Sequence, residues 1–147
     1  MDDIKILYTE AVDLLKQLIA IPSFSREEER TAACIAQFLN KKEIPYKQVG
    51  NNIWATNLYF DAHKPSILLN SHHDTVKPNS GYQLNPFDPI VANEKLFGLG
   101  SNDAGGCLVS LLACFVYYYN KPSLGYNLII AATAEEEISG KNGVEAL

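Results

Sequence analysis

Residues 126–137, YNLIIAATAEEE, join an apolar run directly to three consecutive glutamates. The run is short and follows a turn sequence, which is typical of a strand buried on both faces. At a protein surface, Glu135, Glu136 and Glu137 would be an ordinary solvated helix start, where the helix dipole favours anions. At the end of a central strand, the repulsion among three carboxylates is costly unless cations are present. The stretch therefore predicts a buried strand and leaves two interpretations for the acidic cluster that follows it.

Helical and strand patterns alternate along the rest of the chain. Helical spacing or long apolar runs predict helices over about residues 2–19, 26–43 and 103–119. Shorter runs predict strands over residues 46–49, 53–58, 66–70, 95–99 and 126–133. This order indicates an α/β fold, a three-layer sandwich with a mostly parallel central sheet, in which ligands collect at the carboxyl ends of the strands. The strand 66–70 is apolar on both sides and is expected to be a central strand covered by helices.

The second predicted helix carries a start signal of its own. Ser25 and Glu28 have the spacing of a capping box. We therefore expect Ser25 to be the N-cap residue and Glu28 to reach back to it. The Ile-Pro pair at residues 44–45 follows the expected end of this helix.

Length and composition limit the classes of function. The 147 residues are 47% apolar and 20% charged, which is ordinary for one globular domain. A net charge of -5 provides no basic face for phosphates, so we expect no nucleic-acid partner. Without an apolar run of about 18 residues or a basic-then-apolar amino terminus, we expect a cytoplasmic protein with no membrane partner. The three cysteines form no close pair, and buried free thiols are expected.

A second polar cluster lies in residues 68–76, LLNSHHDTV, where His72, His73 and Asp74 follow the predicted strand 66–70. Alternate residues of an extended chain share a face, so His72 and Asp74 point one way and His73 the other. A ligating histidine usually gives its second ring N–H to a carboxylate. His72 as a metal ligand oriented by Asp74 is therefore chemically coherent, although a structural loop would carry the same residues.

The third cluster is the glycine-rich stretch 98–106, GLGSNDAGG, between a predicted strand and a predicted helix. Plain helix capping would explain Asp103. The spacing matches neither glycine-rich phosphate motif, and no Lys follows as in a P-loop. Three clusters after three strands favour a metal site over a metal-free binding domain, which would have to explain them as coincidence. Nitrogen and carboxylate ligands without a thiolate suit zinc, with cobalt or manganese as substitutes.

In order and separation, the three clusters resemble the motifs of the zinc amidohydrolases that include acetylornithine deacetylase, succinyl-diaminopimelate desuccinylase, aminoacylase and carboxypeptidase G. SHHDTV resembles S-H-x-D-x-V, GLGSNDAGG resembles G-x-G-x-x-D-x-x-G, and TAEEE resembles T-A-D-E-E. The resemblance covers essentially the whole chain and looks strongest to the acetylornithine deacetylase branch. Family members often have Arg, Lys and Asp where this chain has Leu99, Gly105 and Glu135, which puts the subgroup in question rather than the metal chemistry.

The resemblance implies a role for each candidate residue. His72 would bind one zinc, Glu137 the other, and Asp103 would bridge the two. Asp74 would orient His72, and Glu136 would act as the general base. The two zinc ions would activate a shared water and polarise the scissile carbonyl, while Glu136 carries the proton to the leaving amine.

The resemblance also implies a substrate and a chain organisation. The substrate would be a small N-acylated amino acid, first N-acetylornithine in arginine biosynthesis, with desuccinylase, aminoacylase or dipeptidase activity as alternatives. Family chains are more than twice as long and carry a second, dimerising domain, so residues 1–147 would be the amino-terminal part of the catalytic domain of a homodimer. The family's remaining ligands would lie beyond Leu147, and an inactive metal-binding or interaction fragment is the competing interpretation. A cis peptide bond is expected between Asn102 and Asp103.

Overall fold

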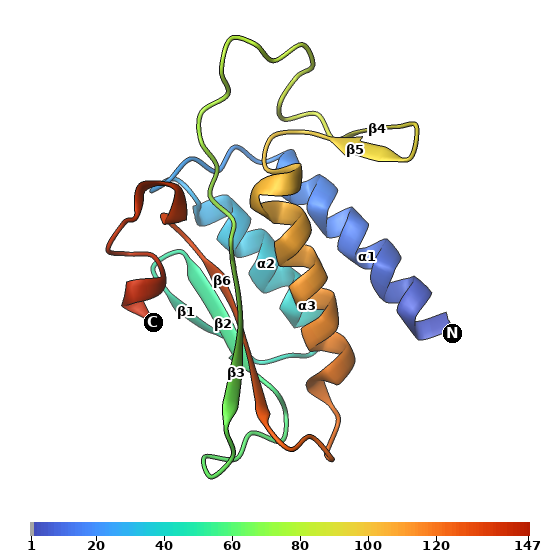
Figure 1. The fold of residues 1–147 in the computed structure, drawn as a ribbon, viewed down its shortest axis with the longest axis vertical. Helices are drawn as coiled ribbons and strands as arrows, with labels where there is room; N and C mark the ends of the chain where they lie inside the picture. Colours follow the sequence, from blue (N-terminus) through green and yellow to red (C-terminus); the bar gives the residue numbers. More distant parts are fainter. Residues whose placement is uncertain (1) are drawn as a thin grey trace.

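Three helices pack on one face of a four-stranded sheet in the computed structural model, which describes residues 2–147 (Figure 1). The helices are α1 (Asp2–Ile19), α2 (Glu29–Lys41) and α3 (Gly106–Tyr119). α2 and α3 lie against the sheet, and α1 packs across both of them (Figure 1). The three predicted helices are confirmed, but α3 is preceded by a separate kinked segment, η1 (Ser101–Gly105), in which Asp103 and Ala104 have non-helical backbone angles. Within residues 2–147, no helix has both the length and the apolar character that crossing a membrane requires.

The sheet is mixed rather than mostly parallel. Its strands are β1 (Lys47–Val49), β2 (Asn52–Thr56), β3 (Ser66–His72) and β6 (Asn127–Thr133), in the order β1-β2-β6-β3. β6 runs parallel to β3 but antiparallel to β2, and β1 pairs antiparallel with β2. Only a tight hairpin can join β1 to β2 across the two residues between them, and a hairpin is necessarily antiparallel. The predicted α/β class is confirmed, with this change in strand direction.

β6 is the central strand, whereas β3 lies at the edge of the sheet. In β3, Ile67 is 45% exposed and Leu68 is 53% exposed. Among residues 2–147 no helix covers the opposite face of the sheet (Figure 1). The prediction that residues 66–70 form a covered central strand is therefore wrong, and the described residues form two layers rather than three. An apolar run indicates that a strand can be covered, but it does not identify the segment that covers it.

A long connecting segment separates β3 from α3. Residues 77–89 contain no helix or strand, as predicted, and lead into a hairpin of β4 (Ile90–Ala92) and β5 (Lys95–Phe97). The sequence pattern predicted β5 and missed β4. After β6 the chain continues through two short helical turns, η2 (Glu136–Ile138) and η3 (Val144–Ala146).

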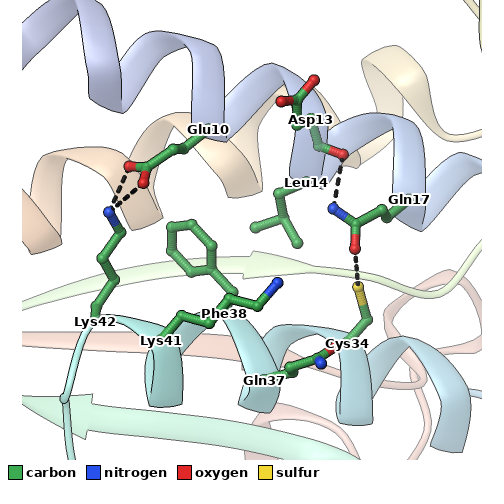
Figure 2. Close-up of a pocket in the computed structure, with 9 residues that line it drawn as sticks. All are labelled: Glu10, Asp13, Leu14, Gln17, Cys34, Gln37, Phe38, Lys41 and Lys42. Atoms are coloured by element: carbon green, nitrogen blue, oxygen red, sulfur yellow. Dashed lines mark hydrogen bonds and ion pairs between the residues drawn. The ribbon is translucent and has the colours of Figure 1, made fainter.

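A hollow of about 240 Å³ lies between α1 and α2 and is lined mostly by polar side chains (Figure 2). On one wall, the Cys34 thiol donates a hydrogen bond to Gln17 Oε1 at 3.8 Å (Figure 2). All three thiols are free as predicted, but Cys34 is only half-buried and Cys107 and Cys114 are exposed. The expected burial is wrong for α3 because this helix is apolar around its circumference and its outer side faces solvent. The hollow contains none of the residues predicted for the functional site.

Candidate metal centre

The carboxyl ends of β3 and β6 lie side by side, because the two strands run parallel and His72 is paired with Thr133. Residues 72–74 and 134–137 therefore meet at one edge of the sheet. The turn η1 reaches the same edge and places Asp103 beside His72. The three polar clusters thus meet at the end of the parallel strands, as predicted, but the prediction that each follows a strand of the sheet is wrong for Asp103, because within residues 2–147 β5 pairs only with β4.

Three of the predicted site residues form a group that can hold a metal. One ligand atom each from His72, Asp103 and Glu137 lies within 4.8 Å of the other two, and His72 Nε2 is 3.1 Å from Asp103 Oδ1. The imidazole is buried, whereas the Asp103 side chain is 78% exposed, so the group opens to solvent. One nitrogen and two carboxylates without a thiolate suit zinc, cobalt or manganese. The residues fit a divalent metal, and their role as ligands stays a prediction.

Asp74 lies at the other nitrogen of the His72 ring. His72 Nδ1 is 3.3 Å from Asp74 Oδ1 and 3.1 Å from the backbone carbonyl of Asp74. The hydrogen bond to the Asp74 carboxylate raises the pKa of His72 to about 9, against the lowering effect of burial. A proton held on Nδ1 leaves Nε2 as the nitrogen that can bind a metal.

The Asp74 carboxylate also holds other parts of the site. The Ser25 hydroxyl donates to it at 2.7 Å, and the backbone N–H groups of Glu136 and Glu137 each donate at 3.1 Å. Burial alone would raise the pKa of Asp74, but these donors and the imidazole together lower it to about 2. Asp74 therefore connects the predicted ligand His72 to the turn that carries two of the glutamates.

The Glu135 side chain points into the interior of the protein. It is 5% exposed, and its Oε1 accepts a hydrogen bond from Asn142 Nδ2 at 2.8 Å. Gly140 lies so close to the Glu135 side chain that a Cβ at residue 140 would overlap it. Glu135 therefore holds the turn that follows η2, which makes it a structural link and not a member of the metal group.

Glu136 and Glu137 face the site instead. Glu136 Oε2 lies 3.5 Å from His72 Nε2, and its side chain is 59% exposed. The pKa of Glu137 is raised, first by burial and next by the nearby Asp103 carboxylate. This arrangement does not fit the alternative of a plain solvated helix start, because the carboxylates converge on an imidazole at a sheet edge.

His73 points away from the group, as the alternation predicted. It is 6% exposed, its Nδ1 lies 2.9 Å from Thr31 Oγ1, and its Nε2 lies 3.0 Å from the backbone carbonyl of Asn51. Burial lowers the pKa of His73. Its contacts tie α2 to the start of β2, so the two neighbouring histidines have separate environments.

The capping box predicted for α2 is wrong. The helix begins at Glu29, and Glu28 occupies the cap position without a side-chain capping bond. Ser25 donates instead to Asp74, and Glu28 Oε1 accepts from the backbone N–H of Glu135 at 3.2 Å. These partners lie 49 and 107 residues away in the sequence, where a local spacing rule cannot detect them. For Ser25 and Glu28, the sequence pattern thus predicted the wrong hydrogen-bond partners, and both residues belong to the surroundings of the site.

Two expectations about Asp103 also change. α3 starts after Gly105 with no side-chain cap, so helix capping does not explain Asp103. The cis peptide bond joins Asp103 to Ala104, one bond later than the resemblance implied. Non-proline cis bonds are set by tertiary context and leave no local signal in residue types, so the sequence could not separate the two bonds.

Comparisons with known proteins agree with this arrangement. A family model described as Peptidase family M20/M25/M40 matches residues 68–147. The succinyl-diaminopimelate desuccinylase of Blochmanniella floridana is 26% identical over an alignment of 149 positions, which covers 96% of this chain and 39% of the relative.

Two solved structures show the fold. Human carnosine dipeptidase 1 has a TM-score of 0.74 at 21% identity, over 95% of this chain and 34% of that one. The Bacillus subtilis protein YXEP, described as a dinuclear metal binding peptidase, has a TM-score of 0.67 at 17% identity, over 97% of this chain and 38% of that one. The chain therefore spans less than two fifths of the length of the curated relative and of each solved structure.

Proposed function

The chain belongs to peptidase family M20/M25/M40, and from this premise we propose that it forms the amino-terminal part of a metal-dependent hydrolase. The reaction would be cleavage of an amide bond in a small N-acylated amino acid or peptide. The observation that carries the proposal is the convergence of His72, Asp103 and Glu137 from three distant segments, with ligand atoms within 4.8 Å. A homodimer and a cytoplasmic location of the complete protein belong to the same proposal.

Each residue of the site has a chemical task in this proposal. A divalent metal, when bound, would polarise the scissile carbonyl and lower the pKa of water. His72 would bind it through Nε2 while Asp74 retains the proton on Nδ1. Glu136 is exposed beside the group, and its carboxylate would take a proton from the attacking water and deliver it to the leaving amine.

Three substrate classes follow from different observations. The curated relatives support N-succinyl-diaminopimelate, because succinyl-diaminopimelate desuccinylases match over 89–96% of this chain. The motif resemblance supports N-acetylornithine, and the likeness to a dipeptidase adds short peptides. We place the succinylated substrate first and the acetylated one second.

Metal titration tests the site, with Zn2+ or Co2+ added to the metal-free 147-residue chain in a calorimeter. Asp103→Asn should weaken binding by at least about tenfold, because it removes a charged ligand. The matched control, Asp88→Asn, changes an exposed carboxylate in the loop 77–89 and should leave the affinity unchanged. Equal affinity of the wild type and Asp103→Asn would contradict the proposed site.

Hydrolysis is tested separately, with both acylated substrates and a dipeptide, on this chain and on a longer chain that contains it. Glu136→Gln should retain the metal affinity and lose turnover by at least about 100-fold, because only the proton carrier is removed. Turnover that survives this substitution would contradict the role of Glu136.

The exposed edge of β3 favours a second candidate function. Ile67 and Leu68 lie uncovered on an edge strand, which is a surface suited to pairing with another chain. The chain would then be a metal-binding interaction fragment without turnover of its own. Sedimentation should show self-association that Leu68→Lys abolishes, whereas a strictly monomeric wild type would rule this candidate out.

A further inference from the structure

The turn that carries the glutamates is held by buried side chains on all of its backbone N–H groups. We define the acidic turn as residues 134–137. Its four consecutive N–H groups donate to side chains of three buried residues: Ala134 to Asn52 Oδ1 (2.9 Å), Glu135 to Glu28 Oε1 (3.2 Å), Glu136 to Asp74 Oδ1 (3.1 Å) and Glu137 to Asp74 Oδ2 (3.1 Å). The acidic turn is thus fixed from behind by groups that do not themselves face solvent.

Glu28 is the charged member of this set that has no role in the site chemistry. It is fully buried, and within residues 2–147 no Lys, Arg or His side chain forms an ion pair with it. Its Oε1 accepts from the N–H of Arg26 at 2.7 Å as well as from Glu135, and its Oε2 accepts from Asn51 Nδ2 at 2.8 Å. Three donors and no cation therefore surround one buried carboxylate.

A local role in α2 does not account for this side chain. Glu28 makes no side-chain capping bond, and the helix uses only its backbone carbonyl, which accepts from Ala32 N at 2.9 Å and from Thr31 Oγ1 at 3.0 Å. The side chain points instead to the start of the acidic turn. Glu135 has φ of 53° there, a left-handed conformation that non-glycine residues adopt only when their surroundings hold them.

We propose that Glu28 is a positioning residue of the metal centre. By accepting the N–H of Glu135, it holds this residue in the left-handed conformation, and that turn directs the carboxylates of Glu136 and Glu137 towards His72. Without this hydrogen bond, Glu135 is free to return to ordinary backbone angles and the two carboxylates turn with it. The expected effect on metal affinity rests on the proposed function. The effect of Glu28 on the backbone of the acidic turn does not, because it can be measured in the metal-free chain.

Glu28→Gln is the sharpest test, because glutamine has the same shape but no charge: the N–H groups of Arg26 and Glu135 then face either a weaker, neutral acceptor oxygen or the NH2 group. Asn127→Asp is the matched control. Asn127 is also fully buried, at the opposite end of β6, and its Nδ2 donates to the carbonyls of Asp61 and Lys64. Both variants exchange amide and carboxylate without a change of size, so both should lower the melting temperature, and only Glu28→Gln disturbs the acidic turn.

The first readout is the affinity of the 147-residue chain for Co2+, measured by calorimetry. Glu28→Gln should weaken binding by about 10- to 100-fold, as loss of a group that supports metal ligands typically does, and Asn127→Asp should change it by less than about twofold. The second readout is amide hydrogen exchange in the metal-free chain. The amides of residues 135–137 should exchange at least about tenfold faster in Glu28→Gln than in Asn127→Asp.

The outcomes separate this inference from the proposed function. Failure of the wild type to bind Co2+ would overturn the metal site, and exchange at residues 135–137 would still decide the role of Glu28. Unchanged exchange and unchanged affinity in Glu28→Gln would overturn the positioning role. If Glu28→Gln does not fold, Glu28→Asp, which retains the charge but shortens the side chain, should give the same faster exchange at residues 135–137, and unchanged exchange there would overturn the inference.

Discussion

His72 and His73 are neighbours at the end of β3, yet their imidazole rings lie on opposite sides of the chain and have pKa shifts of opposite direction. On one side, His72 lies between the carboxylates of Asp74 and Asp103, and the hydrogen bond to Asp74 raises its pKa to about 9. On the other side, His73 is enclosed between α2 and the start of β2, where burial lowers its pKa. Both rings are buried to a similar extent. Burial is the main cause of the pKa shift of His73, whereas the hydrogen bond to Asp74 outweighs burial at His72, and this partner separates a predicted ligand from a structural residue.

The difference between the two histidines has its largest expected effect on metal binding. His72→Ala should weaken Zn2+ binding by about 100- to 1000-fold, because a complete four-ligand zinc site binds with about 10 to 16 kcal/mol in all and the substitution removes one whole ligand. His73→Ala should leave the affinity within about threefold, because its ring faces away from the group. Calorimetry on both variants measures the contrast, with His63→Ala as an exposed histidine control. Similar losses of Zn2+ affinity in His72→Ala and His73→Ala would contradict the assignment of only His72 as a ligand.

The opposite pKa shifts predict opposite effects of pH on the metal-free chain. The pKa of His72 is raised from 6.5 to about 9 in the fold, so its stabilisation is fully present below pH 6.5 and is lost as pH rises through 9. The size of this loss is about 3 kcal/mol of unfolding free energy. The pKa of His73 is lowered, so its contribution is present above pH 6.5 and is lost as pH falls through its folded value.

Urea unfolding of the metal-free chain at pH 6.5, 7.5 and 9 measures the contribution of His72. His72→Gln cannot titrate at this position, so its stability should fall much less than that of the wild type between pH 6.5 and 9. NMR titration of the two imidazoles gives an independent check. A pKa of His72 near 6.5 would remove the electrostatic half of the comparison.

For His73→Ala we expect a loss of stability without a loss of metal affinity. His73→Ala removes a buried ring and its contact with the Thr31 hydroxyl, and it leaves the Asn51 carbonyl without the imidazole as its partner. The expected cost is about 2 kcal/mol of unfolding free energy. Urea unfolding near neutral pH measures this cost. An unchanged free energy of unfolding would mean that these two contacts do not stabilise the packing of α2 against β2.

The sequence could predict the two histidine directions because they depend on local geometry. The alternation of an extended chain separates His72 from His73, and the apolar runs locate β3, β6 and α3. The convergence of the clusters after β3 and β6 also follows, since it needs only that the ends of parallel strands share one edge of the sheet, whereas Asp103 reaches this edge through η1 and not from a strand of the sheet. These are properties of single elements, and residue spacing records them.

The features that could not be predicted from the sequence depend on contacts between distant segments. The spacing of Ser25 and Glu28 is a valid local capping signal, but their side chains find stronger partners in Asp74 and in the N–H of Glu135. The edge position of β3 depends on which strand pairs with β6, and the inward turn of Glu135 depends on Asn142 and Gly140. No periodicity within one segment contains this information.

Ser25 gives the smallest predicted effect and tests how far the support of His72 extends. Ser25→Ala removes one of the donors to the Asp74 carboxylate, a hydrogen bond of 2.7 Å, and should cost about 1 to 2 kcal/mol of unfolding free energy. Since Asp74 keeps its bonds to the imidazole and to the N–H groups of Glu136 and Glu137, Zn2+ affinity should fall by only about threefold. Ser23→Ala is the control, a buried serine in the same segment whose backbone carbonyl, not its hydroxyl, accepts the N–H of Thr75 at 2.8 Å. A Zn2+ affinity loss in Ser25→Ala as large as that in His72→Ala would mean that the hydroxyl, and not the carboxylate alone, sets the orientation of the ring.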